Sequence, residues 1–196
     1  MDKKQLIIKS FLELVTESGS MKDISVKKIS DKAGVGKGTI YEYFTSKEEI
    51  IKKAVEYMID IMAQSFLVNE GYEILSFEES LKKYIDNIYQ GSIIVNKFSK
   101  YNHHNINEIL NYVDMKEVFL TKIKHFQKAN LDIFKNNVLA KGVREGFTDN
   151  SLDDFDILII LKSIIRELTE NLEFKSIDDI VLKNKLYKMS YKLIRK

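Results

Sequence analysis

The sequence predicts an all-α protein, and three observations support this. The 196-residue chain has no proline and only eight glycines, so few residues interrupt helices. It is rich in Lys, Ile, Leu and Glu, a composition most easily accommodated in helices. Apolar residues recur with helical spacing, as at Ile8, Phe11, Leu12 and Val15. We expect about nine helices, arranged as an N-terminal three-helix domain and a larger helical C-terminal domain.

The N-terminal domain, residues 1–47, is expected to hold three short helices that share one small core. Ser25 can cap the second helix, and Gly34 can end it. The third helix spans 36–44 and buries Ile40 and Phe44. Helices this short are not stable alone, so they must pack together.

The C-terminal domain, residues 48–196, begins within a linking helix at about 47–67. Capping-box patterns at Ser46/Glu49 and Ser76/Glu79 open this helix and the next one, which runs to about Asn96. The later helices are expected at 108–113, 115–141, 151–172 and 176–192, with Ser151 and Ser176 starting the last two.

Composition excludes several classes of protein. Without cysteine, the chain has neither disulfides nor thiolate metal sites. No apolar run approaches the roughly 18 residues that a membrane helix needs. Lys9 and Glu13 interrupt the N-terminal apolar segment, unlike the core of a signal peptide. We therefore expect a cytoplasmic protein with no membrane partner.

The second and third helices form the pattern of a helix-turn-helix, whose second helix enters the DNA major groove. The segment 36–39 offers small, hydrogen-bonding groups where bulky ones would keep the helix away from the bases. Residues 1–47 also carry nine lysines against six acidic residues, a small basic excess. The expected DNA contacts are Ser25, Lys27, Gly36, Lys37, Gly38, Thr39, Tyr41, Tyr43 and Lys47.

Each type of contact has a chemical reason. Lys37 can reach a phosphate or a guanine edge, and Thr39 can contact a base. Tyr41 and Tyr43 carry hydroxyls suited to phosphates. The pattern alone also fits an ordinary helical protein, in which Tyr41 packs beneath the third helix and the lysines are simply solvated.

The run AGVGKGTIYEYFTSKEEI (33–50) resembles the signature of the tetracycline-repressor (TetR/AcrR-like) transcriptional regulators, and the likeness extends over residues 6–55. The resemblance implies a homodimer with an all-helical body and a ligand pocket. Two positions depart from the family pattern. Gly36 replaces a frequent serine, so a capping hydroxyl is missing. Glu42 places a negative charge on the reading helix, where it either points away from DNA or reads a cytosine amine.

In that family the last two helices form the dimer interface as a four-helix bundle. The apolar stripes on 151–172 and 176–192 are also compatible with an intramolecular core. The two-fold symmetry needed to read a palindrome favours an interface. The expected interface residues are Phe155, Ile159, Lys162, Leu186, Met189 and Leu193.

Aromatic and methionine residues of the middle helices form either plain core or the lining of a cavity for an apolar or aromatic effector. The candidate ligand contacts are Met62, Phe66, Tyr89, Phe98, Tyr112, Phe126, Asn130 and Arg166. Neither the histidines, at 103, 104 and 125, nor any nucleophile motif predicts a metal site, a cofactor or an enzyme.

The sequence thus predicts a ligand-responsive homodimeric regulator, a repressor of a palindromic operator. Two alternatives stay open. One is an architectural or assembly DNA-binding protein of the same fold without an inducer. The other is a helical binding or scavenging protein without DNA function.

Overall fold

The computed structural model describes residues 2–18, 20–21, 23–101, 114–148 and 151–195, and all side chains within them except those of 95 and 97–101. These residues form helices and their connections, without a strand among them, which confirms the all-α prediction. The chain divides into two compact units. The first comprises Met1–Ile61 and Lys97–Lys122, and the second Met62–Asn96 and Ile123–Lys196. The domain boundary predicted after residue 47 stays a prediction.

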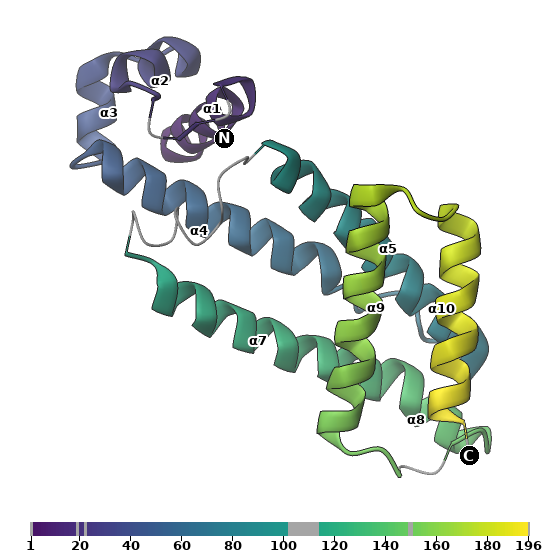
Figure 1. Cartoon of the computed structure of the whole chain (residues 1–196). Coiled ribbons are helices and arrows are strands. Elements are labelled where there is room, and N and C mark those ends of the chain that lie inside the picture. Colours follow the sequence, from purple (N-terminus) through teal and green to yellow (C-terminus); the bar gives the residue numbers. More distant parts are fainter. Residues whose placement is uncertain (1, 19, 22, 102–113, 149–150, 196) are drawn as a thin grey trace. The chain divides into compact units, whose positions relative to one another are not determined.

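The first unit is built around three short helices and the beginning of a long one (Figure 1). These are α1 (Lys3–Ser18), α2 (Val26–Ala33), α3 (Lys37–Tyr43) and α4 (Lys47–Phe66). They share one core, as predicted, which contains Ile7, Phe11, Ile29, Ile40, Phe44, Ile50 and Ile51. Because every one of these helices contributes to the same apolar cluster, α2 and α3 are held in place although each is too short to persist alone.

The turn between α2 and α3 follows from local chemistry. The Ser25 hydroxyl accepts the backbone N–H of Lys28 at 3.3 Å and caps α2, as predicted. Gly34 ends α2 in the left-handed region, with φ of 63°, where a side chain would be strained. Gly36 precedes α3 without a side-chain cap, so the third helix begins at Lys37.

The two predicted capping boxes differ in outcome. At the start of α4, Glu49 donates its N–H to Ser46 Oγ at 3.2 Å. Its carboxylate, however, accepts the backbone N–H and hydroxyl of Thr45 at 2.6 and 2.7 Å, so the reciprocal bond to Ser46 is replaced. Ser76 and Glu79 form both bonds and open α5 (Phe77–Tyr101), which continues past the predicted end at Asn96.

The remaining helices are α7 (Lys116–Phe134), the π-helical segment η1 (Lys135–Leu139), α8 (Ala140–Arg144), α9 (Asp154–Phe174) and α10 (Asp179–Ile194). The first three form one continuous helical stretch, so the described residues contain eight such stretches. The sequence did not predict the π-helical turns. The helix predicted at 108–113 lies outside the described residues.

The predicted starts of the last two helices were wrong by a few residues. Asp153, not Ser151, caps α9 and forms a capping box with Asp156. Asp178, not Ser176, caps α10 by accepting two backbone N–H groups. Aspartate caps helices as well as serine does, and in both cases it stands directly before the apolar repeat.

The core of the second unit is rich in aromatic side chains. The Tyr84 hydroxyl donates to the Asn130 side-chain oxygen at 2.8 Å, and its ring meets that of Phe134 edge-on at 4.8 Å. Complete burial raises the pKa of Tyr84 well above its usual range, so its hydroxyl stays a donor. The other fully buried members include Phe77, Leu81, Ile88, Val138, Ile164 and Leu168.

Candidate nucleic-acid interface and effector cleft

The third helix presents one face to solvent and is fixed by a single buried residue on the other. Ile40 is fully buried, and at about 100° per residue Gly38 and Glu42 each lie about 160° around the axis from it. Lys37, Gly38, Tyr41 and Glu42 are exposed, and half of the Tyr41 side chain is accessible. The outward face therefore consists of short or polar groups.

The glycines of this helix are not required by packing within the protein. A Cβ built on Gly38 would meet nothing within 4 Å, and one on Gly36 would make only an ordinary contact with Thr39 Oγ1 at 3.9 Å. Glycine also weakens a helix relative to alanine. Open backbone on the outer face is what a close approach to another molecule requires.

Two predicted contacts lie on the flank of the face rather than at its centre. Thr39 and Tyr43 are half-buried, and Tyr43 packs against the core of the first unit. The packing role considered for Tyr41 therefore applies better to Tyr43. Lys47, at the start of α4, is half-buried and has an interaction partner.

The lysines near the turn differ in their pairing. Lys32 pairs with Glu17 at 2.7 Å and with Glu13 at 3.6 Å on α1, and the hydrogen bond that it donates to Glu17 is the main reason that the pKa of Lys32 is raised. Lys27 and Lys37 are exposed and make no ion pair with any residue that the structure describes. Both are therefore available to a phosphate.

The sequence model described as "Bacterial regulatory proteins, tetR family" matches residues 14–54, which include α2, α3 and the turn between them. The N-terminal segment of the chain belongs to this family. The protein is accordingly a DNA-binding transcriptional regulator and not an enzyme.

Two kinds of relative extend beyond the N-terminal segment. The fatty acid metabolism regulator protein of Bacillus subtilis (strain 168) is 29% identical over 152 residues, which cover 75% of this chain and 71% of that protein. The fold is similar to that of the fatty acid degradation regulator FadR from Bacillus halodurans, with a TM-score of 0.62, 21% identity and coverage of 99% and 95%. FadR of B. subtilis in complex with stearoyl-CoA gives a TM-score of 0.55 at 22% identity, with 97% of both chains covered.

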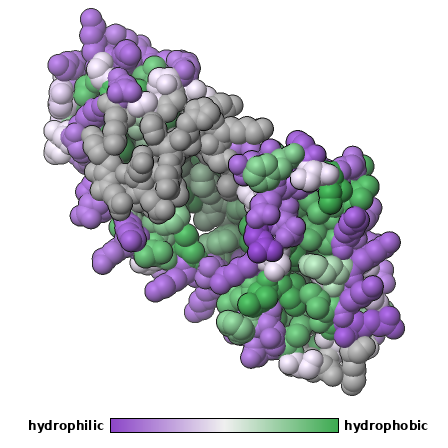
Figure 2. Space-filling model, viewed as in Figure 1, coloured by the Kyte–Doolittle hydropathy of each residue, from purple (hydrophilic) through white to green (hydrophobic). Residues whose placement is uncertain are grey.

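The last two helices of the chain carry an exposed apolar face. Phe155 is 70% exposed and Ile159 51% exposed on α9, and Leu193 on α10 is 52% exposed. Hydrophobic atoms gather over α9 and α10 in Figure 2. Of the remaining interface candidates, Lys162 and Met189 are exposed, whereas Leu186 is buried within its own unit.

The predicted ligand contacts are mostly engaged in internal packing. The ring of Phe66 is buried and lies 5.5 Å from that of Phe126. Tyr89 donates its hydroxyl to Asp179 at 2.7 Å, which raises the pKa of Tyr89 to about 12. Asn130 is buried and accepts from Tyr84, as described above.

The other candidates are dispersed. Met62 is half-buried, and Arg166 is exposed and pairs with neighbouring glutamates of α9. The side chain of Phe98 and the whole of Tyr112 lie outside the described residues. The ligand assignments stay predictions.

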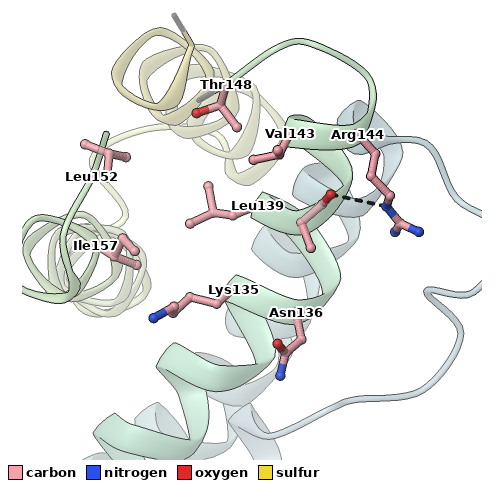
Figure 3. Close-up of a pocket in the computed structure, with 9 residues that line it drawn as sticks. Lys135, Asn136, Leu139, Val143, Arg144, Thr148, Leu152 and Ile157 are labelled. Carbon is pink, nitrogen blue, oxygen red and sulfur yellow. Dashed lines mark hydrogen bonds between the residues drawn. The ribbon is translucent and has the colours of Figure 1, made fainter. Parts of the chain in front are cut away.

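A cleft of about 600 Å³ lies in the second unit beside η1 and α8, and none of the predicted ligand contacts lines it. Leu139 and Val143 face Leu152 and Ile157 across it, and Arg144 points to the other side of its helix (Figure 3). Lys135 lies at one end, where Asp154 accepts from it at 2.6 Å and raises its pKa. The cleft is mainly apolar between its ends, and its size is ordinary for a small-molecule site.

The opposite side of α8 fastens the connection between α4 and α5. Lys141 is buried and donates to the carbonyl of Tyr72 and to that of Leu75 at 2.6 Å. One turn later, the Glu145 carboxylate accepts the N–H of Phe77 at 2.9 and 3.1 Å. Helix α8 therefore faces the cleft on one side and holds the segment 72–77 on the other.

Sequence reasoning missed this arrangement, although one signal was present. Gly142 lies between the two fastening residues, and a Cβ there would lie 2.8 Å from Thr148 Cγ2 and 3.0 Å from the Phe77 ring. Nothing in the sequence places Lys141 against a turn some 70 residues earlier.

Two absences concern the described residues only. None of the helices there combines the length and the apolar character that crossing a membrane needs. No group of three His, Asp or Glu residues in the described ranges can hold a metal ion, and His125 lies exposed on α7. His103 and His104 lie outside these ranges.

Proposed function

We propose that the protein is a homodimeric repressor that inserts α3 into successive major grooves of a palindromic operator. The observation that carries this proposal is the outer face of α3, where open glycine backbone and polar groups lie opposite a single buried anchor, Ile40. Two such faces, related by two-fold symmetry, read half-sites about one helical turn or a multiple apart.

The contacts are tested by gel shift and footprinting on the DNA that flanks the protein's own coding region, at several salt concentrations. Lys37→Ala is expected to weaken binding to all sequences and to reduce the slope of log K against log salt by about 0.9. Lys47→Ala is expected to act likewise. Thr39→Ala is expected to lose roughly 1–3 kcal/mol at one base position. Lys188→Ala, exposed on α10, is the control. If Lys37→Ala, Lys47→Ala and Thr39→Ala all bind the DNA with unchanged affinity, the assignment of these contacts is wrong.

The dimer is proposed to form through the apolar face of α9 and α10. An interface of this kind buries apolar side chains that are otherwise in contact with water. A charge at its centre, Phe155→Lys or Ile159→Lys, is expected to give monomers in analytical ultracentrifugation and to abolish operator binding. Ile74→Lys is the matched control, because Ile74 is 95% exposed in the α4–α5 connection. Dimers that persist in both variants contradict this interface.

The effector is proposed to be a long-chain acyl thioester. This rests on two relatives: the B. subtilis fatty acid metabolism regulator and the structure of B. subtilis FadR with stearoyl-CoA. The proposed location of the acyl chain is the cleft between α8 and α9, which has facing aliphatic side chains. Such a ligand shifts DNA affinity only by its differential affinity for the two states of the protein.

We propose that helix α8 transmits the effect of the ligand toward the DNA-binding helices, because the cleft lies on one side of α8 and the 72–77 segment on the other. A displacement of α8 by an acyl chain would reach Tyr72 and Phe77 through Lys141 and Glu145. The segment they hold connects α5 to α4, and α4 shares a core with the reading helix.

The test adds stearoyl-CoA to the protein–operator complex, with coenzyme A alone as control. We expect release of DNA by stearoyl-CoA, and loss of that release in Val143→Trp, which fills the cleft. Leu120→Trp, exposed on α7, is the matched control. Operator binding that no acyl thioester alters supports the inducer-free alternative instead.

A further inference from the structure

We infer that Glu42 is a specificity-determining residue that accepts a hydrogen bond from the N4 amine of a cytosine in each operator half-site. This inference rests on the proposed operator binding, and it assigns the base that the centre of the reading face selects.

The position of Glu42 on α3 carries the argument. Glu42 and Gly38 are the two residues most nearly opposite the buried Ile40, and they lie one turn apart on the same face. Gly38 has no side chain, and nothing within 4 Å occupies the space that a Cβ would take. The Glu42 carboxylate is therefore the longest group along the central line of the face that meets the groove.

The Glu42 carboxylate is not engaged by other parts of the protein that the structure describes. Glu42 is exposed and makes neither a hydrogen bond nor an ion pair with any other residue that the structure describes. The acidic residues at the start of α4 differ in this respect, since Glu48 and Glu49 accept hydrogen bonds from nearby residues. No internal bond therefore has to be broken when Glu42 meets another molecule.

The charge restricts what Glu42 can meet. A carboxylate is repelled by phosphates, so its presence opposes nonspecific binding. In the major groove, guanine N7 and O6 and thymine O4 are acceptors and are also unfavourable to it. The remaining donors are the amines of cytosine and adenine, and carboxylates pair with cytosine N4. At the centre of the face, Glu42 thus rejects most base edges and favours one.

The test is selection of DNA from a randomised duplex library at fixed salt by the full-length protein and by three variants. The wild type is expected to enrich a palindromic motif with cytosine at one position in each half-site, favoured roughly 5- to 150-fold over the other bases. Glu42→Gln is expected to change that position to adenine, because glutamine pairs with adenine N6 and N7. Glu42→Ala is expected to lose the preference there and to keep the rest of the motif.

Asp31→Asn is the control, because Asp31 is an exposed acid of the same unit on α2. It removes one negative charge and is expected to leave every position of the motif unchanged. A motif that stays the same in Glu42→Gln and Glu42→Ala, with only a general rise in affinity, overturns the inference and leaves the regulator intact. If the wild type enriches no palindromic motif, the operator proposal itself fails.

Discussion

The candidate sites in the two units of this protein are assembled from the sequence in different ways. In the first unit, the reading face comes from seven consecutive residues, and one short stretch of sequence holds the turn, the glycines and the anchor at Ile40. In the second unit, the cleft combines residues between Lys135 and Ile157 from η1, α8, the next connection and α9, and the 72–77 fastening joins residues 66 to 69 positions apart.

The difference has a physical origin. A helix that meets DNA needs its functional groups at fixed angles around one axis, and helical spacing alone supplies those angles. A cleft for a small molecule needs walls from several elements, and their side chains become neighbours only after the core has packed. Variants that affect one unit and not the other test this contrast.

The largest effects are expected from truncating one fully buried isoleucine in each unit. Ile40→Ala in α3 and Ile164→Ala in α9 remove the same atoms, and each is expected to cost about 2–4 kcal/mol. Hydrogen exchange measured by mass spectrometry should rise mainly in α1–α3 for the first variant and in α9–α10 for the second. Equal increases in both units for either variant would show that they open together, which would weaken the contrast.

The next largest effect concerns the fastening of the second unit. Lys141→Met keeps the length of a buried side chain but removes the ammonium that donates to the carbonyls of Tyr72 and Leu75. We expect a loss of about 1–3 kcal/mol in the free energy of unfolding, measured with urea. Lys188→Met, on the exposed side of α10, is the control. If the two variants are equally stable, the buried ammonium does not hold the segment.

The same contrast explains what the sequence predicted. Ser25, Gly34, Ile40 and Phe44 have the expected structural roles, because capping, chain reversal and burial within 20 residues follow from local rules. In the second unit the helices were predicted, but their starts shifted to Asp153 and Asp178, and the π-helical turns were not foreseen.

The cleft beside η1 and α8 could not be predicted, for a reason that particular residues make clear. Phe66 and Phe126 have the composition of a ligand pocket, yet their rings pack against each other. Leu139 and Ile157 look like ordinary core residues in the sequence, yet they line the cleft. Composition identifies apolar side chains, but only the packing of helices against one another decides which of them face a cavity.

Smaller changes in stability, of opposite sign, are expected when the glycines at 34 and 38 are replaced by alanine. Gly34→Ala is expected to destabilise the first unit by about 1–2 kcal/mol, because φ is 63° although space is free. Gly38→Ala has equal space and an ordinary helical backbone, so it is expected to stabilise the fold by up to about 1 kcal/mol.

The two variants separate stability from binding when thermal melts are compared with operator titrations. Gly38→Ala should bind the operator more weakly despite its greater stability, since its methyl group stands on the face that we propose to approach the bases. Tighter binding by Gly38→Ala would mean that the open backbone at this position has no part in reading DNA.

The smallest effect concerns the glutamate that accepts hydrogen bonds at the start of a helix in each unit, Glu49 in the first and Glu79 in the second. Hydrogen bonds from the backbone and hydroxyl of Thr45 lower the pKa of Glu49, and those from Ser76 lower the pKa of Glu79, each from an ordinary value of 4.5. Because the unfolded chain binds these protons more strongly, both carboxylates stabilise the fold above pH 4.5 and lose this effect as the pH falls through the native pKa. Glu49→Gln and Glu79→Gln should therefore be less stable than the wild type in urea at pH 7, and the difference should shrink toward pH 3. A gap that is constant with pH would assign the effect to side-chain packing rather than charge. A gap that closes for both residues would mean that local chemistry is the same in the two units, and that they differ only in how distant residues are assembled into a site.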